Sequence, residues 1–200
     1  MPKYKELIFA SHNNGKINEI REMLSPLGIK ILSGNDLNLP DVEETGQTFE
    51  ENAYIKALAA AQAKNIPCIA DDSGLCVDAI GGKPGVYTAR YAPDRDFNKG
   101  MDKLLAEIEA TNSGNRAAHF SCVIVLAHPN GNYISFEGRV DGQIAKQKSG
   151  CAGFGYDPIF IPTGFSRSFA EFDSEEKNKI SHRGRALQKF IDYLSNKADF

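Results

Sequence analysis

The sequence lacks several features that would mark particular protein classes. Its four cysteines, Cys68, Cys76, Cys122 and Cys151, show no CxxC spacing, so we expect reduced thiols rather than a zinc or redox site. No apolar stretch approaches the ~20 residues of a membrane helix, and no signal peptide precedes the first strand-like run. We therefore expect a cytoplasmic protein with no membrane partner.

An excess of basic residues is also missing. The chain has 23 Lys and Arg against 26 Asp and Glu, which gives a formal net charge of -3. Proteins that bind the nucleic-acid backbone usually carry a basic surface, so DNA or RNA binding is disfavoured. A single nucleotide needs only a few local cations and stays a candidate ligand.

The 200 residues, 42% of them hydrophobic, suffice to bury a sizeable core. Repeats, linkers and low-complexity segments are missing, and we predict one domain over residues 1–200. Strand-like and helical patterns alternate in the first half, and a hairpin-rich region follows, so we predict an α/β fold. Strands are expected at 6–11, 29–32, 66–70, 116–145 (two or three, with a turn at 129–131) and 157–162. Helices are expected at 16–28, 48–64, 98–110 and 182–196.

The helix that starts after Thr48 has the clearest start signal. Glu51 stands three residues after Thr48, which is the spacing of a capping box. Asn52 and Lys56 are four residues apart and so share one face of this helix. We expect the apolar face to bury Tyr54, Ile55, Leu58 and Ala61.

Two adjacent acids follow the strand-like run at 66–70, in "ADDSGL". We expect Asp71 and Asp72 to end this strand, where ligands of open α/β sheets bind. Carboxylates at such a place suit Mg²⁺, which takes one or two protein carboxylates together with phosphate oxygens and water. Glu43 and Glu44 form a second acidic pair, in a predicted loop, and either a ligand role or a solvated surface fits them.

Three further stretches carry polar or aromatic groups where a ligand could use them. "SHNNGK" (11–16) lies between a strand and a helix, where backbone N–H groups and a lysine can bind an anion. "GFGYDP" (153–158) places aromatic rings beside glycines. In "SHRGRAL" (181–187), a histidine and an arginine occupy a first helical turn, against the helix dipole. Cations, carboxylates, aromatics and donors together indicate a nucleoside triphosphate site.

These motifs make the chain resemble the Ham1-type inosine triphosphate pyrophosphatases over nearly its whole length. The resemblance runs in order through "SHNNGK", "EETGQTFEENAYIKA", "ADDSGL", "GGKPGVYTARYA", "GFGYDPIF" and "EEKNKISHRGRAL". It implies an elongated α/β mixed-sheet fold with two lobes flanking a central substrate cleft, and a homodimer. It also implies Mg²⁺-dependent hydrolysis of ITP, dITP and XTP to the monophosphate and pyrophosphate.

The resemblance also implies a set of site residues. Asp72 would be the catalytic base, and Asp72 and Glu43 would bind the metal, although Glu44 is not excluded because the loop varies in length. The substrate-binding residues would be Ser11, His12, Asn13, Asn14, Gly15, Lys16, Lys56, Ser73, Phe154, Gly155, Tyr156, Asp157, Lys177, His182 and Arg183.

Alternatives from other classes are a Maf-type triphosphatase for modified pyrimidine nucleotides, a nucleotide-binding module without hydrolysis, and a metal-dependent phosphomonoesterase. The "GFGYD" and "SHR" stretches argue against the first, and the acids at 43 and 72 argue against the second. The phosphomonoesterase would release orthophosphate rather than pyrophosphate.

Overall fold

The computed structural model describes residues 4–196. The chain forms two compact units, each assembled from separate segments. The first unit contains the chain up to Asp72, Cys122–Gly138, and the chain from Arg183 onward. The second unit contains Ser73–Ser121 and Arg139–His182. A single domain over 1–200 stays a prediction.

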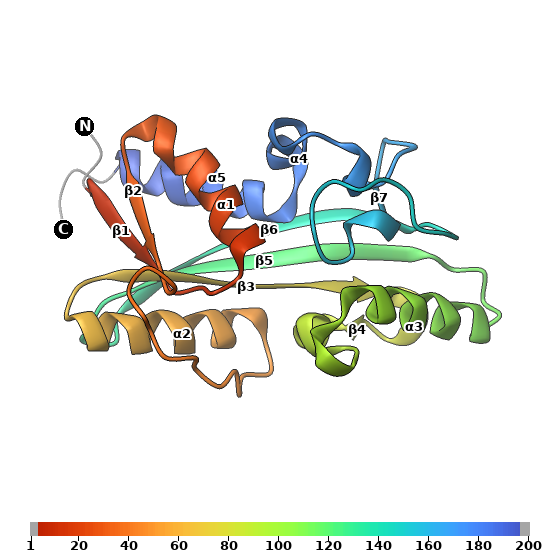
Figure 1. The fold of residues 1–200 in the computed structure, drawn as a ribbon, viewed down its shortest axis with the longest axis horizontal. Helices are drawn as coiled ribbons and strands as arrows, with labels where there is room; N and C mark the ends of the chain where they lie inside the picture. Colours follow the sequence, from red (N-terminus) through yellow and green to blue (C-terminus); the bar gives the residue numbers. More distant parts are fainter. Residues whose placement is uncertain (1–3, 197–200) are drawn as a thin grey trace. The chain divides into compact units, whose positions relative to one another are not determined.

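Residues 4–196 form seven strands and five α-helices (Figure 1). The strands are β1 (Glu6–Phe9), β2 (Lys30–Ser33), β3 (Cys68–Val77), β4 (Lys83–Pro84), β5 (Ala117–Ala127), β6 (Tyr133–Ile144) and β7 (Phe160–Pro162). The helices are α1 (Asn14–Leu24), α2 (Phe49–Lys64), α3 (Phe97–Ala110), α4 (Ser174–Ile180) and α5 (His182–Asn196).

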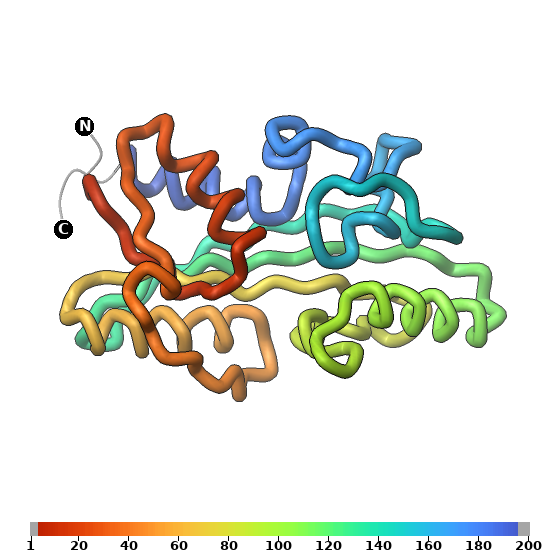
Figure 2. The backbone as a smooth tube through the Cα atoms, viewed as in Figure 1, coloured from red at the N-terminus to blue at the C-terminus, as the bar shows by residue number. Residues whose placement is uncertain are grey.

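The strands form a mixed sheet in the order β2-β1-β3-β5-β6-β7, with β4 also paired to β3. β1 pairs parallel with β2 and β3, whereas β4 pairs antiparallel with β3 and β7 antiparallel with β6. The parallel neighbours β1 and β2 are visible side by side in Figure 2. Parallel pairs come from the alternating first half of the sequence, and the predicted α/β class with a mixed sheet is confirmed.

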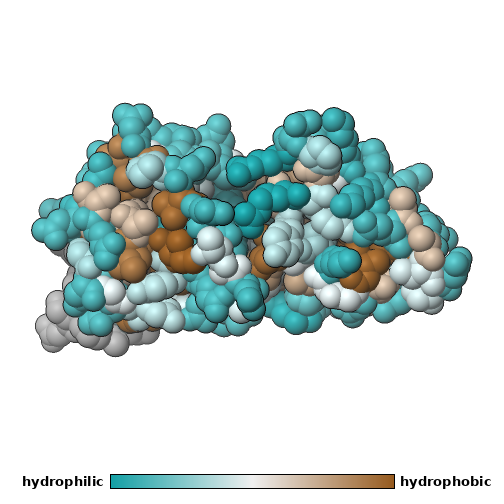
Figure 3. Space-filling view, turned by 90° about the horizontal axis from the view of Figure 1, so that it is seen from below, coloured by the Kyte–Doolittle hydropathy of each residue, from teal (hydrophilic) through white to brown (hydrophobic). Residues whose placement is uncertain are grey.

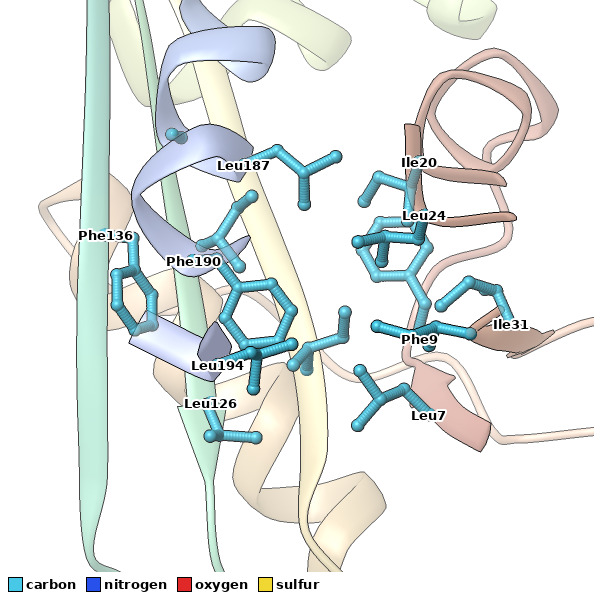
Figure 4. Close-up of a cluster of buried hydrophobic side chains, with 14 of the residues drawn as sticks. Leu7, Phe9, Ile20, Leu24, Ile31, Leu126, Phe136, Leu187, Phe190 and Leu194 are labelled. Carbon is cyan, nitrogen blue, oxygen red and sulfur yellow. The ribbon is translucent and has the colours of Figure 1, made fainter. Parts of the chain in front are cut away.

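The main core of the first unit lies between the strands and two helices, α1 and α5. Figure 4 shows Ile20 and Leu24 of α1 on one side and Leu187, Phe190 and Leu194 of α5 on the other. The sequence of α5 carries an apolar stripe at 186, 187, 190, 191 and 194, and this stripe faces the core, since the residues at 186, 187, 190 and 194 are buried here and the one at 191 is partly buried. This packing fixes the first turns of both helices, which carry site residues.

Helix α2 belongs to the first unit, and its buried face differs from the prediction. The capping box is present, because Thr48 Oγ1 accepts from the N–H of Glu51 and the Glu51 side chain accepts from Thr48 N–H. The face against the strands consists of small residues, and the larger apolar side chains expected there are only half-buried. A helix approaches a sheet closely when its contacting side chains are small. The buried residues of α2 are Asn52, Ala53, Ala57, Ala60 and Ala61.

The core of the second unit is built around aromatic side chains. Tyr156 is only 2% exposed and packs edge-on against Phe97. A Cβ at Gly100 would lie 2.5 Å from the Tyr156 hydroxyl oxygen, so α3 needs glycine at this position. Phe120 contacts the rings of Phe160 and Phe169.

Two further predictions can be compared with the strands. The hairpin predicted within 116–145 is formed by β5 and β6, whose turn is closed by the bond from His128 N–H to Asn132 O. The strand predicted at 157–162 is shorter, because Asp157–Ile159 form a 3₁₀ turn and only Phe160–Pro162 pair with β6. Proline at position 158 has no N–H to donate to a ladder.

In the surface view of Figure 3, hydrophilic residues predominate and hydrophobic ones form separate patches. Among residues 4–196, no helix has the length and apolar character needed to cross a bilayer.

Candidate active site

The acidic pair lies inside strand β3 rather than at its end. We predicted that Asp71 and Asp72 would end the strand, but β3 continues to Val77. Successive side chains of a strand point to opposite faces of the sheet, so the two carboxylates do not face each other. Asp71 contacts Lys16 and Arg183, whereas Asp72 contacts Asn52 and Lys56, so positive charge lies beside both carboxylates.

Asp71 is held by two cationic side chains of the first unit. The Lys16 ammonium lies 3.2 Å from Oδ1 and 3.1 Å from Oδ2 of Asp71. Arg183 donates to Oδ2 from Nη2 at 3.1 Å and from Nε at 3.3 Å, and the Cys122 thiol donates to the same oxygen at 3.8 Å. Burial alone would raise the pKa of Asp71, but the charges of Lys16 and Arg183 outweigh it and hold that pKa below its ordinary range.

Arg183 has a second carboxylate partner, Glu19 of helix α1. Arg183 is only 2% exposed and Glu19 8%, so this is a buried network of two acids around one guanidinium. The same two acids raise the pKa of Arg183, against the opposing effect of its burial. An arginine in the first turn of a helix opposes the dipole, and here the two carboxylates compensate for it.

Asp72 lies among different partners. Asn52 Nδ2 donates to Oδ2 of Asp72 at 3.1 Å, and the Lys56 ammonium lies 3.8 Å from Oδ1. Asn52 and Lys56 share one face of α2, as their spacing predicted. Burial raises the pKa of Asp72, although Lys56 and Lys16 act in the opposite direction.

The loop before α2 brings one of its two acids to this group. Glu44 Oε1 lies 2.6 Å from the Lys56 ammonium, and the Glu44 side chain is 25% exposed. Glu43, by contrast, is exposed. The loop is held to α2 by Gly46 N–H, which donates to Asn52 Oδ1 at 2.8 Å. The metal role predicted for Glu43 stays a prediction, but the geometry favours Glu44.

The predicted phosphate loop connects β1 to α1. Asn13 is the N-cap of α1, and its Oδ1 accepts from Lys16 N–H at 3.1 Å. His12 lies outside the helix, with Nε2 2.9 Å from Leu39 O and Nδ1 3.1 Å from Asp41. Ser11 Oγ accepts from Asn13 N–H at 3.3 Å. The remaining two residues of the motif, Asn14 and Gly15, begin the helix.

The other predicted residues lie in the second unit, where Asp157 organises a loop. Asp157 Oδ2 accepts from Phe154 N–H at 2.8 Å and from the Lys177 ammonium at 2.6 Å. Both charged side chains are almost fully buried. A Cβ at Gly153 would lie 2.1 Å from Asp157 Oδ2, so glycine is required there. The ammonium of Lys177 also lies 4.8 Å from the centroid of the Phe154 ring.

The two predicted aromatics of this loop have different environments. Phe154 is half-buried, whereas Tyr156 is part of the core described above, and burial raises the pKa of its hydroxyl to about 12. Gly155 has φ +66°, a left-handed conformation that favours glycine. His182 stacks on the Phe120 ring, with centroids 4.7 Å apart. Ser73 follows Asp72 directly in β3.

Three residues near the acids were absent from the predicted site, namely Glu19, Asn52 and Cys122, and Glu44 was predicted only as an alternative to Glu43. Glu19 stands three residues after Lys16, a spacing that places both on one side of α1 and could have signalled it. Nothing in the sequence around Cys122 indicates its contact, because β5 and β3 are about fifty positions apart in the chain.

Comparisons with known proteins agree with this arrangement of motifs. The model of the Ham1 family matches residues 7–193. A dITP/XTP pyrophosphatase from Ruegeria pomeroyi is 47% identical, covering 92% of this chain and 93% of that protein. One from Bacillus subtilis is 46% identical, covering 95% and 97%. The structure of a HAM1 protein from Coxiella burnetii superposes with a TM-score of 0.89 at 42% identity, covering 96% and 99%.

Proposed function

This chain belongs to the Ham1 family, and we propose that it hydrolyses non-canonical purine nucleoside triphosphates to the monophosphate and pyrophosphate. The substrate class is that named for its relatives, dITP and XTP, together with ITP. The observation that carries the proposal is the arrangement around Asp72. Two lysines, two further acids and a helix N-terminus lie within one unit, which suits a metal-bound triphosphate.

The carboxylates of the site fit Mg²⁺, which also takes ligands from substrate and water, better than a metal whose ligands all come from the protein. Within residues 4–196, no three His, Cys, Asp or Glu side chains are grouped as metal ligands. Mg²⁺ needs only one or two carboxylates, since phosphate oxygens and water complete its octahedron. We propose that Asp72 and Glu44 would hold it. The bound ion would supply positive charge against the negative charge that develops on the phosphate oxygens.

In the proposed reaction, water attacks the α-phosphorus and pyrophosphate leaves. Asp72 orients this water and accepts its proton, while Asn52 holds the carboxylate through Oδ2. Lys16 and Lys56 stabilise the departing pyrophosphate by their charge. Lys16 is well suited to this because its backbone N–H is already fixed by the N-cap at the start of α1.

Recognition of the purine base would use hydrogen-bond donors of the protein that pair with the carbonyl at C6. ATP carries an amino group there, so buried donors would lose their acceptor, and such mismatches can cost up to ~10⁴-fold in rate. Because Arg183 already donates to Asp71 and Glu19, its proposed role is also to orient Asp71. An Arg183→Ala variant separates the two roles. Selective loss with ITP supports base recognition, and equal loss with every nucleotide supports orientation.

The test of the proposed function is a pyrophosphate-release screen with ITP, XTP, dITP, ATP, GTP and the pyrimidine triphosphates, with and without Mg²⁺. We expect turnover of the first three only, dependent on the metal, and a loss of at least ~10²-fold in Asp72→Asn. The matched control is Asp36→Asn, which alters an exposed carboxylate paired with Arg21 and should retain activity. Orthophosphate release, a pyrimidine preference or normal turnover by Asp72→Asn would each contradict the proposal.

A further inference from the structure

The ammonium of Lys56 lies between the two carboxylates proposed as metal ligands. It is 2.6 Å from Glu44 Oε1 and 3.8 Å from Asp72 Oδ1. The three side chains are 16%, 25% and 8% exposed for Lys56, Glu44 and Asp72, so solvent screens their charges only partly. One cation of the protein itself therefore already bridges the two acids.

These three charges act on one another. Burial disfavours the charge on each of these side chains, and the attraction between the ammonium and the two carboxylates offsets that cost. Without a positive charge between them, Glu44 and Asp72 would repel each other in this half-buried place. The position therefore requires a cation.

A divalent ion and the ammonium cannot both use the same oxygens. Mg²⁺ binds carboxylate oxygens at about 2.0–2.1 Å, and two cations competing for the same pair of acids repel each other. Lys56 can yield its position without any change in α2, because the ammonium ends a flexible four-carbon stem with three rotatable donors. A strongly negative triphosphate beside the site would offer the displaced ammonium new partners.

We propose that Lys56 is a resident counter-ion of the metal site, which competes with the divalent cation for Glu44 and Asp72 and transfers to the triphosphate when the metal binds. The inference rests on the proposed function and deepens it. The metal alone binds weakly, since it must displace an ammonium. The triphosphate removes that competitor, so metal and triphosphate strengthen each other's binding by the same factor.

The test compares the nucleotide-free wild-type chain with Lys56→Met, using Mn²⁺ as the metal probe and its free electron paramagnetic resonance signal as the readout. We expect Lys56→Met to bind Mn²⁺ about tenfold more tightly or better, because the unit positive charge that competes for the two carboxylates is removed. Inorganic triphosphate, titrated by calorimetry without metal, should bind the same variant more weakly. Misfolding would weaken both ligands and cannot produce this opposite pair of changes.

Three controls accompany the measurement. Lys30→Met removes an ammonium from the exposed pair with Glu6 and should leave Mn²⁺ binding unchanged, which controls for net charge. Asp72→Asn added to Lys56→Met should abolish the gain. Lys56→Gln is the second neutral variant, used if circular dichroism shows that methionine at position 56 lowers the folded fraction.

Unchanged or weaker Mn²⁺ binding by both neutral variants would overturn the inference, as would a gain that survives Asp72→Asn. These measurements need no hydrolysis. If the pyrophosphate screen fails while Mn²⁺ binding tightens as expected, the proposed reaction is wrong and the role of Lys56 stands. If the screen succeeds and Mn²⁺ binding does not tighten, only the role of Lys56 is wrong.

Discussion

Replacing Asp71 with asparagine should destabilise the protein strongly, although the new side chain has nearly the same shape. Asp71 is 1% exposed, and its carboxylate faces Lys16 and Arg183 at 3.1–3.3 Å. Removing one partner of a buried ion pair costs about 3–5 kcal/mol, because the remaining charge is left uncompensated. Arg183 keeps Glu19, and asparagine keeps one acceptor oxygen, so we expect the low end, about 3 kcal/mol.

Urea denaturation at pH 7 measures this loss of unfolding free energy. A typical domain has about 5–15 kcal/mol in total, so the shift in the midpoint should be large. Glu175→Gln is the matched control, because it breaks an ion pair with Lys179 in which both side chains are exposed, and little change is expected. In the double variant Asp71→Asn/Arg183→Met, the loss of unfolding free energy should be smaller than the sum of the losses in the two single variants, as expected for residues in contact.

A loss below about 1 kcal/mol for Asp71→Asn, or full additivity in the double variant, would refute the reasoning. Either result would mean that Asp71 and Arg183 do not form a coupled buried pair. The ion pair between Asp71 and Arg183 would then not be what stabilises the buried charges around β3.

Three further predictions concern other parts of the chain. Gly100→Ala should lower the midpoint of thermal unfolding, because the overpacking against Tyr156, about 1–3 kcal/mol, exceeds the helix propensity gained by alanine; an unchanged midpoint would show that Tyr156 can move. Asp157→Asn should lower the free energy of unfolding, measured by urea denaturation, by about 3 kcal/mol, since it leaves the buried ammonium of Lys177 uncompensated; an unchanged urea midpoint would contradict this. Hydrogen bonding from the backbone lowers the pKa of Glu171, so its stabilisation is present above the ordinary pKa of 4.5 and lost as the pH falls through the lowered folded-state value. Glu171→Gln should therefore be less stable than wild type at pH 7, and the two urea midpoints should converge in acid; a constant difference would contradict this.

The sequence allowed the elements with strong local signals to be predicted. The capping box at Thr48 and the apolar stripe of α5 each depend on residues a few positions apart, and both are present. The buried face predicted for α2 was correct at Ala61 but wrong for its three larger residues, which are only half-buried, because size rather than hydrophobicity decides which side chains fit where a helix approaches a sheet closely. Proline in the segment 157–162 likewise shortened a strand that the apolar pattern alone suggested.

The candidate site was predictable where its residues lie within one motif, and less so where distant segments meet. Asn52 and Lys56 could be placed on one face of a helix because they are four residues apart. The pairing of Arg183 with Glu19 joins positions 164 apart, and no local rule indicates it. The choice between Glu44 and Glu43 depends on the path of a loop, which sequence patterns do not determine.

The course of β3 through its acidic pair has a consequence for the lengths that this strand tolerates. Asp71 and Asp72 serve opposite sides of the sheet only because side chains alternate along an unbroken strand. Deleting Ala70, which lies between the β1 pairing at Cys68 and Ile69 and the acids, would move Asp72 to the place of Asp71 beside Arg183 and Ser73 to the place of Asp72. Inserting one residue there would move Asp71 to the place of Asp72 and leave Arg183 without that carboxylate. Single-residue insertions and deletions here should therefore be tolerated far less than in the loops.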